Sequence, residues 1–526
     1  MNFGAEFSNF MRRMIWLLLG GVVAAAAMGV MSGRQEPLPS FSSHVLENKA
    51  RFVPEKCWFE TAKNDDVQCG FMHVAPSSPD QASPFQLPVV VMRYTGKDRQ
   101  PDPLVYLSGG PGSASWLEQK SIETYWLDWF KQKQGMKRDL VLFDQRGTGL
   151  SKPSLQCDEY RELSASILAN PGTPEQNASR YRSVSQQCRD SLLTAGMPLQ
   201  ELGTERSAGD VNDLLQLLGY AQGNLLGVSY GTRLALEVQR QFPLQVRSLS
   251  LDSIYPPGEH LFRDWPDLLA EGLERIFRAC DASPRCQLEN GDVRARYAVL
   301  RDKLRKEPLQ VDVSRLGLAG GVQTLRLNDE ILLAILFDAQ YASNSLQSLP
   351  AMIRHLQEDR LDLAMGHIES YLLHQFDDAF SEPVFWSVEC HDNPVISRER
   401  MDARVNAHPE LRYYLPHDYD VCDVWVADKP VEGLKLTETP RETPALILSG
   451  EDDPITPSHW AVKAAEQQFV PETTYLFRFA NIAHSVMDNK DCANDLFINF
   501  VNQPNKRPRA DCRFDDAQKV LAAQTH

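Results

Sequence analysis

Short apolar runs alternate with amphipathic stretches along the first half of the chain. The runs are rich in Val and Leu, and most of them end in loops that carry Gly or Asp, so each run predicts a β-strand. Between the runs, apolar residues recur at helical spacing, most clearly in residues 207–218 and 232–240. The predicted strands cover residues 67–74, 87–94, 103–107, 139–143, 223–227 and 246–251.

The order of these elements predicts the fold class. A turn rich in Pro and Ser joins the first two strands, which indicates an antiparallel pair. The later strands alternate with helices, and such alternation produces a mostly parallel sheet with helices on both faces. We therefore predict an α/β fold.

The alternation stops near Pro256 and resumes with strands at residues 445–448 and 474–479. Between them lie amphipathic segments such as residues 268–277 and 329–336, which predict helices. We expect this insertion to lie over the carboxyl edge of the sheet, where sheets of this type hold their ligands. The predicted division is a core at residues 50–256 and 441–515, and a mainly helical cap at residues 257–440.

The N-terminus carries an uncharged apolar run at residues 14–31, directly after Arg12 and Arg13. The run is longer than the roughly 7–15 residues of a signal-peptide core and at the short end of the roughly 17–25 of a spanning helix. Residues 1–33 therefore predict export to the periplasm or the extracellular space, as a cleaved signal peptide or as a retained membrane anchor. A buried core helix is the alternative.

The cysteines agree with export, because all ten of them follow the apolar run and their number is even. Buried reduced thiols would be favoured only in a reducing compartment. Connectivity does not follow from sequence alone, but pairing between neighbours is the simplest hypothesis. It gives the pairs 57–69, 157–188, 280–286, 390–422 and 492–512.

Size and charge narrow the classes of function. The chain has 526 residues, of which 43% are hydrophobic, so it can bury a large core. Lys and Arg number 54 against 70 Asp and Glu, which gives a formal net charge of -16. Nucleic acid is not expected as a partner, because binding to phosphates depends on clustered positive charge.

Residues 227–231, Gly-Val-Ser-Tyr-Gly, lie between a predicted strand and a predicted helix. A serine on such a sharp turn holds its hydroxyl clear of the sheet, and the glycines are required because the corner is crowded. We predict that Ser229 is a nucleophile. The alternative is an ordinary serine at the start of a helix.

A serine hydroxyl needs a base to take its proton, and the base needs a carboxylate to orient it. In folds of this type the chain order is Ser, then the acid, then His. His484 follows the predicted strand at residues 474–479, so its imidazole can turn over the sheet edge towards Ser229. We predict His484 as the base, and we expect His459 to lie at the start of a helix instead.

Glycines also follow the strand at residues 103–107, in the sequence Leu-Ser-Gly-Gly-Pro-Gly-Ser. Glycines let backbone N–H groups approach a reacting carbonyl, and donors that are fixed in advance stabilise an oxyanion. The predicted oxyanion donors are the N–H groups of Gly110 and Tyr230, and the alternative is a simple Gly-Pro turn. In the tight turn at residues 144–149, Asp144 or Arg146 is expected to brace neighbouring loops.

Together these motifs resemble the α/β-hydrolase aminopeptidases, that is, the proline iminopeptidase group and its larger, secreted, tripeptidyl-aminopeptidase-like bacterial members. The resemblance implies an α/β-hydrolase fold and a serine exopeptidase that acts on the free amino end of short peptides, without a metal or cofactor. The motifs are GGPG at 109–112, DQRGTGLS at 144–151, GVSYG at 227–231, GEDDPITP at 450–457 and the terminal His484.

The resemblance also selects one acid from the run Glu451-Asp452-Asp453. The similar enzymes place the acid of the triad three residues after the loop glycine, which is Asp453 when counted from Gly450. Asp453 also precedes a proline, which favours an extended backbone and helps to fix the direction of the carboxylate. Glu451 and Asp452 are then loop acids, with Asp452 as the alternative partner of His484. A metal site is not expected, because no His or Cys lies at ligand spacing.

One feature departs from the smaller proline iminopeptidases, and another resembles the larger members. The smaller enzymes carry His before GGPG, whereas this chain has Ser108, so proline specificity does not follow. The segment at residues 386–392 resembles a motif of the larger members near the mouth of the active site. Glu389 or Asp392 is therefore predicted to pair with the α-ammonium of the substrate, and a structural role beside a disulfide of Cys390 is the alternative.

Three hypotheses about function follow. The first is hydrolysis of peptides from the amino end, with Ser229, Asp453 and His484 as the triad. The second keeps this triad but acts on an ester or lipid, since fold does not fix function. The third is a catalytically silent binding module, which the ordered serine, acid and histidine disfavour.

Overall fold

The computed structural model describes residues 44–62, 65–76, 83–318, 321–343, 345–393, 397–411, 421–425, 433–434, 440–510 and 520–522. The apolar run predicted as a signal peptide or anchor lies outside these residues. No helix within the described ranges combines the length and the apolar character that a membrane span requires.

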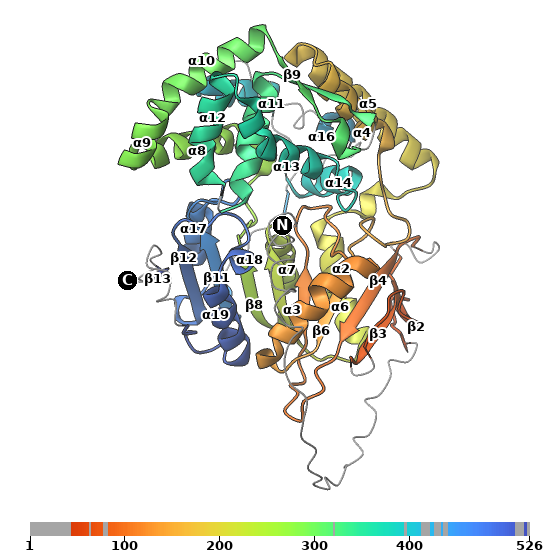
Figure 1. Ribbon diagram of the computed structural model, residues 1–526. Coiled ribbons are helices and arrows are strands. Elements are labelled where there is room, and N and C mark those ends of the chain that lie inside the picture. Colours follow the sequence, from red (N-terminus) through yellow and green to blue (C-terminus); the bar gives the residue numbers. More distant parts are fainter. Residues whose placement is uncertain are drawn as a thin grey trace, which may run out of the picture.

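A single large sheet forms the base of the molecule (Figure 1). The described strands are β1 (His44–Val45), β2 (Arg51–Glu55), β3 (Val67–His73), β4 (Gln86–Met92), β5 (Leu104–Leu107), β6 (Leu140–Phe143), β7 (Gly223–Val228), β8 (Val246–Asp252), β11 (Ala445–Gly450), β12 (Thr474–Phe479) and β13 (Val520–Ala522). Their order is β1-β2-β3-β4-β6-β5-β7-β8-β11-β12-β13. The pairs from β6 to β12 are parallel, and those at the two ends of the sheet are antiparallel. The predicted α/β class and the antiparallel first pair are confirmed.

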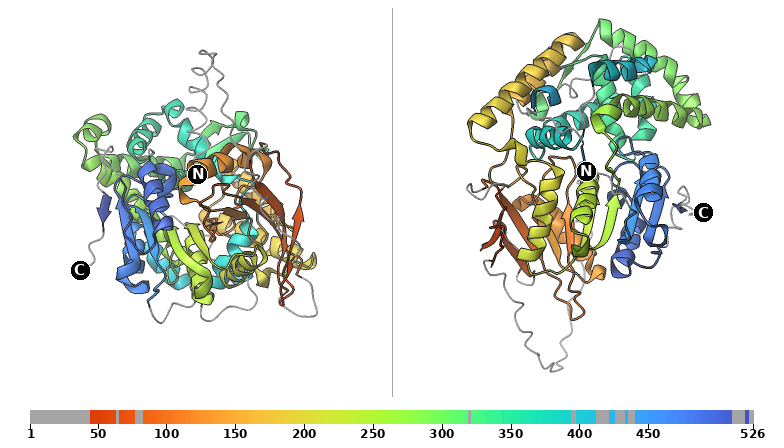
Figure 2. Two further views of the ribbon diagram at one scale, coloured as in Figure 1. Left: turned by 90° about the horizontal axis from the view of Figure 1, so that it is seen from below. Right: turned by 180° about the vertical axis from the view of Figure 1, so that it is seen from behind.

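The helices that cover the sheet are divided between its two faces. Together with the sheet they form what we call the lower layer. These helices are α2 (Gln119–Ser121), α3 (Leu127–Gln132), α6 (Thr204–Leu217), α7 (Tyr230–Gln241), α17 (Ser458–Gln468), α18 (Val486–Asn489) and α19 (Asp491–Asn502). Seen from behind, α6 and α7 lie in front of the strands (Figure 2, right).

Side chains of the central strands alternate between two apolar clusters, one on each face. On β5, Val105 and Leu107 belong to the cluster that includes residues of α6 and α7, whereas Leu104 and Tyr106 belong to the one that includes residues of α3 and α19. Because the side chains of a strand point alternately to opposite faces, a strand that is covered on both sides must be apolar throughout. This explains the continuous apolar runs from which the strands were predicted.

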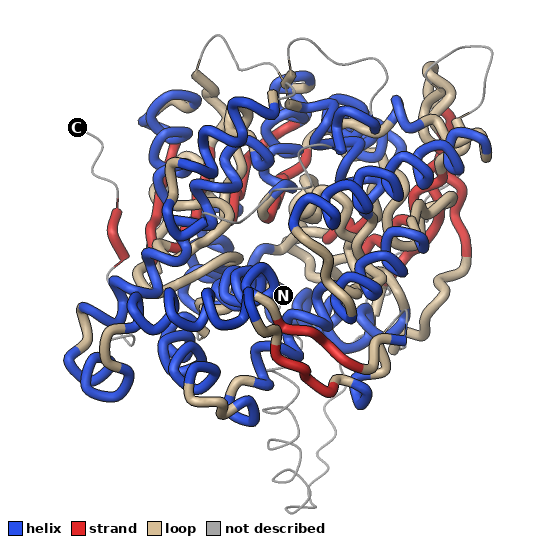
Figure 3. Tube along the Cα trace, turned by 90° about the horizontal axis from the view of Figure 1, so that it is seen from above, coloured by secondary structure: helices blue, strands red, loops and turns tan. Residues whose placement is uncertain are grey.

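A second layer, mostly helical, covers one edge of the sheet, and we call it the upper layer (Figures 1 and 3). It contains α4 (Asp158–Ala169), α5 (Pro174–Thr194), α8 (Leu261–Asp281), α9 (Pro284–Asn290), α10 (Val293–Lys306), α11 (Asp329–Asp338), α12 (Leu349–Gln357), α13 (Met365–Gln375), α14 (Glu382–Asp392), α15 (Arg398–Asn406), α16 (Val421–Trp425) and the antiparallel pair β9 (Leu309–Asp312) and β10 (Thr324–Leu327). Helices α4 and α5 precede β7 in the chain, yet they lie against β10 and α16. The upper layer is therefore built from two separate parts of the sequence.

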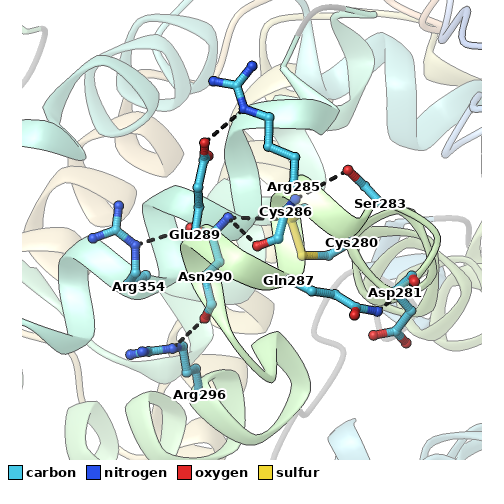
Figure 4. The surroundings of a disulfide bond; sticks show 10 residues. All are labelled: Cys280, Asp281, Ser283, Arg285, Cys286, Gln287, Glu289, Asn290, Arg296 and Arg354. Carbon is cyan, nitrogen blue, oxygen red and sulfur yellow. Dashed lines mark hydrogen bonds and ion pairs between the residues drawn. A yellow bond between two sulfur atoms is a disulfide. The ribbon is translucent and has the colours of Figure 1, made fainter.

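Four of the five predicted disulfides are confirmed, namely 57–69, 157–188, 280–286 and 390–422. Cys512 lies outside the described residues, so the pair 492–512 stays a prediction. Figure 4 shows the disulfide between Cys280 and Cys286, which joins the end of α8 to α9. Beside it, the Asn290 side chain donates to the Cys286 carbonyl oxygen over 3.1 Å. Disulfides of this kind indicate an exported protein.

Candidate active site

Ser229 lies on a sharp turn between β7 and α7, with φ 56° and ψ -125°. A Cβ on Gly231 would lie 2.0 Å from the Leu107 carbonyl oxygen, and one on Gly227 would lie 2.4 Å from the Gly231 oxygen. Only glycine fits at either position, because a Cβ does not approach a backbone oxygen so closely. The crowding that was predicted for this corner is confirmed, and it brings the start of α7 against the end of β5.

Asp453 is completely buried in the loop after β11, and both oxygens of its carboxylate accept hydrogen bonds. Oδ1 accepts the N–H groups of Ile455 at 3.0 Å and Thr456 at 2.9 Å, while Oδ2 accepts the Thr456 hydroxyl at 2.8 Å. Oδ2 also lies 2.9 Å from Nδ1 of His484. Burial opposes the charged form, but the charge and hydrogen bonding of His484 and the bonds from Thr456 outweigh it and lower the pKa of Asp453 below its usual value.

The two acids before Asp453 have other partners. Glu451 pairs with Arg478 of β12 at 2.7 Å. Asp452 is partly buried near Arg275 of α8; burial raises the pKa of this carboxyl, and the charge of Arg275 opposes the rise. Arg275 also donates to the Asp453 carbonyl oxygen over 3.3 Å. Of the three acids, Asp453 is the one whose carboxylate is hydrogen-bonded to His484.

His484 follows β12 and lies in a loop that packs closely on the acid loop. A Cβ on Gly450 would lie 2.2 Å from the Ala483 carbonyl oxygen, so this glycine permits the close approach. The ring of Tyr341 meets the imidazole edge-to-face at 5.3 Å between centroids. The other candidate, His459, lies exposed at the start of α17, as expected.

Asp252, at the end of β8, ties the histidine loop to the nucleophile turn. Its carbonyl oxygen accepts the N–H of Ser229 at 3.0 Å, while its carboxylate accepts the N–H groups of Val486 at 2.8 Å and Met487 at 2.9 Å. One residue thus holds the backbone of both Ser229 and the loop of His484. Asp252 was not among the residues predicted from the sequence, although an acid at the end of a buried strand was a usable signal.

Titration of Asp252 leads to a prediction about stability. Burial raises the pKa of this carboxyl to about 7, although the N–H groups of Met487 and Val486 partly counteract the rise. The stabilising contribution of the neutral carboxyl is complete below about pH 4 and is lost as the pH rises through about 7. Asp252→Asn imitates the neutral form and does not titrate. We therefore expect the unfolding free energy of the variant, relative to that of the wild type, to increase by roughly 2–3 kcal/mol when the pH is raised from about 5 to about 8.

Urea denaturation of both proteins at the two pH values measures this difference. Asp213→Asn is a comparison, because Asp213 is also buried and burial raises its pKa to about 6, but it lies on α6, away from the His484 loop. A stability difference for Asp252→Asn that stays constant or reverses with pH would contradict the prediction.

The Gly-rich loop, residues 108–113, follows β5 and lies beside Ser229. A Cβ on Gly109 would stand 3.2 Å from Cβ of Ser229 and 3.8 Å from its Oγ. Gly110 has φ +104°, a conformation that favours glycine. Tyr230 is the first residue of α7, and the first N–H groups of a helix have no acceptor within the helix. The structure thus places both predicted oxyanion donors on the segments that flank Ser229.

The tight turn after β6 braces this loop, as predicted for Asp144. Its Oδ1 accepts the N–H of Ser115 at 2.7 Å, and its Oδ2 accepts the N–H of Leu150 at 2.8 Å. Gln145 donates to the Ser108 hydroxyl over 3.1 Å. Arg146 instead pairs with Asp210 and Glu201, inside the lower layer.

Glu389 and Asp392 lie at the end of α14 and are buried, with exposed fractions of 0% and 5%. Glu389 Oε2 accepts the Tyr255 hydroxyl at 3.1 Å and the Asn393 amide at 2.9 Å, whereas its Oε1 has no hydrogen-bond partner among the described residues. Both oxygens of Asp392 accept hydrogen bonds from Thr204. Burial raises the pKa of both carboxyls, to about 7 for Asp392, and the nearby charge of Arg233 opposes the rise.

The protein-family model described as the α/β hydrolase fold matches residues 102–491 of this chain. The chain belongs to the α/β-hydrolase family. The predicted fold is thereby confirmed, and the match takes in Ser229, Asp453 and His484.

Curated relatives of this α/β-hydrolase include peptidases. A tripeptidyl aminopeptidase of Streptomyces coelicolor is 27% identical over 267 residues, which cover 46% of this chain and 47% of the relative, so the match spans about half of that protein. Serine protease Hip1 of Mycobacterium tuberculosis is 23% identical over 456 residues, covering 82% of this chain and 84% of the relative. The predicted resemblance to α/β-hydrolase peptidases is confirmed.

A third relative carries the name of another activity. Carboxylesterase B of Mycobacterium tuberculosis is 26% identical over 535 residues, covering 92% of this chain and 94% of the relative. The relatives of this α/β-hydrolase therefore include proteins named for peptide hydrolysis and a protein named for ester hydrolysis.

Proposed function

We propose that this α/β-hydrolase is a serine exopeptidase that releases residues from the free amino end of short peptides through an acyl-enzyme on Ser229. The observation that carries the proposal is the 2.9 Å contact between His484 Nδ1 and the buried Asp453 carboxylate, in a chain whose serine occupies the turn after β7. The similarity to a tripeptidyl aminopeptidase supports the choice of substrate. We further propose that the enzyme acts in the periplasm or outside the cell.

In this mechanism Nε2 of His484 accepts the proton of the Ser229 hydroxyl while Oγ attacks the carbonyl carbon of the scissile peptide bond. Asp453 holds Nδ1–H and stabilises the imidazolium that forms. Its acidic pKa keeps it charged near neutral pH, which this role requires. Collapse of the tetrahedral intermediate breaks the C–N bond, and His484 returns the proton to the leaving amine.

The negatively charged carbonyl oxygen accepts hydrogen bonds from the N–H groups of Gly110 and Tyr230. Such donors are effective because they are fixed before the charge develops. Water then enters, His484 takes one of its protons, and hydroxide attack on the ester releases the amino-terminal fragment as an acid. Ser229 regains its proton from His484, so the cycle needs no other reactant than water.

Of the two acids predicted to receive the substrate ammonium, we propose Glu389. One of its carboxylate oxygens has no partner among the described residues, whereas both oxygens of Asp392 accept from Thr204. An ion pair gains strength when both groups are removed from water. Helix α14 begins directly beside Gly112, so it leads from the Gly-rich loop towards Glu389.

A second candidate function is ester hydrolysis by the same residues, which the match to carboxylesterase B favours. Attack on an ester and on an amide both pass through an oxyanion held by the same donors. The two functions differ in whether a free α-ammonium is required.

The test compares three substrates with one purified protein: an aminoacyl arylamide, its N-acetylated form and a short-chain aryl ester. The exopeptidase proposal predicts that acetylation lowers kcat/KM for the arylamide by at least about 100-fold, since it removes the charge that the site binds. Unchanged turnover after acetylation would rule the exopeptidase out, and rapid hydrolysis of the ester alone would favour the esterase.

Replacement of Glu389 by Gln tests the ammonium site. We expect KM for the free aminoacyl arylamide to rise about 10- to 100-fold, because the amide keeps the shape but not the charge. Hydrolysis of the aryl ester should change little. Asp392→Asn is the matched control, and it should not discriminate between charged and neutral substrates. Equal losses on both substrates with Glu389→Gln would assign this side chain a structural role only.

A further inference from the structure

The upper layer is hydrogen-bonded to the Gly-rich loop through backbone groups. Residues 377–381, which we call the bridging segment, connect α13 to α14. The N–H of Ser381 donates to the Gly112 carbonyl oxygen over 2.9 Å, and the N–H of Ala114 donates to the Ala379 oxygen over 2.8 Å. Ser113 and Phe380 form an antiparallel bridge between these bonds.

The approach is so close that only glycine fits at position 112. A Cβ on Gly112 would lie 2.5 Å from the Ser381 carbonyl oxygen, and the residue has φ +97°. The core side of the loop is held by Asp144 and Gln145, but its other side has the bridging segment as its support. The position of the Gly110 N–H therefore depends on the position of a segment of the upper layer.

Several groups of the bridging segment contact the side chain of one residue, Arg161 of α4. Nη2 of Arg161 donates to the Phe380 carbonyl oxygen at 2.9 Å and to the Asp377 oxygen at 3.3 Å. Nη1 donates to the Asp378 carboxylate, and Nε lies 3.4 Å from the carboxylate of Glu382, the first residue of α14. The Arg161 and Glu382 side chains are 11% and 12% exposed, so their contact is largely shielded from water, whereas the Asp378 side chain is 91% exposed.

Arginine suits this position because its planar guanidinium presents several donors in a fixed fork. One side chain can therefore satisfy two carbonyl oxygens and a carboxylate at the turn before α14. Burial raises the pKa of Glu382, and Arg161 opposes the rise, so the cation favours the charged carboxylate at the start of this helix.

We propose that Arg161 is a positioning residue for the oxyanion donor on Gly110, acting through the bridging segment. The inference rests on the proposed function, because it assigns Arg161 to the same reaction. Arg161 itself does not touch the substrate. It fixes residues 377–381, these residues fix residues 112–114, and the loop then presents the Gly110 N–H beside Ser229.

The test compares Arg161→Met with Arg189→Met. Arg189 of α5 is a matched control, because it also donates to a backbone oxygen of the upper layer, that of Trp425 at 2.9 Å, but in a different region. We expect Arg161→Met to lower kcat about 10-fold or more with KM changed less than about twofold, since a displaced donor weakens the transition state more than the ground state. Arg161→Lys should recover part of kcat, and Arg189→Met should retain it.

Hydrogen–deuterium exchange provides a readout that does not depend on catalysis. In Arg161→Met we expect the amides of Ala114 and Ser381 to exchange about 10-fold faster, with no such change in Arg189→Met. Unchanged exchange at both amides would overturn the inference, and so would faster exchange without a fall in kcat. If the wild type hydrolyses neither peptides nor esters, the proposed function fails, while the exchange rates still decide whether Arg161 holds the loop.

Discussion

Replacement of Ser229 by alanine is expected to lower turnover of peptide and ester substrates by roughly 10⁴- to 10⁶-fold. The variant loses the atom that forms the acyl-enzyme, while the loop, His484 and Asp453 remain in place. The side chain lost is small, so stability should change little. Steady-state kinetics measure the loss, and covalent labelling by a fluorophosphonate probe should disappear with it.

Ser183→Ala is a suitable control, because Ser183 lies exposed on α5 in the upper layer. It should be labelled and turn over substrate like the wild type. If Ser229→Ala retained labelling, another residue would be the nucleophile. A folded wild-type protein that takes no label would instead support a binding module without catalytic activity.

Replacement of Asp453 by asparagine is expected to lower kcat by about 10³- to 10⁴-fold. Asparagine keeps the size of the side chain, but it removes the charge that stabilises the His484 imidazolium and can present an amide in place of the acceptor. Asp452→Asn should lower kcat by less than about fivefold, because this carboxyl faces Arg275 and not His484. Parallel kinetics of the two variants, with circular dichroism to verify folding, measure the difference.

Equal losses in the two variants would mean that the acid has been assigned to the wrong position of the run. A comparable loss in Glu451→Gln would have the same meaning. The expected order of effects, with Asp453 far above the other two, follows from the partner of each carboxylate.

The strands of the sheet were predictable because their signal is local. A strand covered on both faces must be apolar at successive positions. The strands β5, β7 and β11 are therefore recognisable in the sequence as short apolar runs. The turn of Ser229 was predictable for a similar reason, since the crowding that requires Gly227 and Gly231 involves residues close in sequence as well as β5.

The arrangement of distant elements was not predictable from one sequence. Nothing in residues 158–194 distinguishes helices of the upper layer from helices that flank the sheet, because both have one apolar face. Arg161 and Asp252 act through partners that only the folded chain brings near. The burial of Glu389 depends likewise on α7 and the loop after β8, which lie far from it in sequence.

Each disulfide described here lies within one layer: 57–69 belongs to the sheet, whereas 157–188, 280–286 and 390–422 belong to the upper layer. Among the described residues, the two layers are therefore held together by hydrogen bonds, ion pairs and packing, and not by a covalent cross-link. A reductant would loosen each layer from within, whereas a cross-link engineered between them would test whether substrate entry requires the layers to separate.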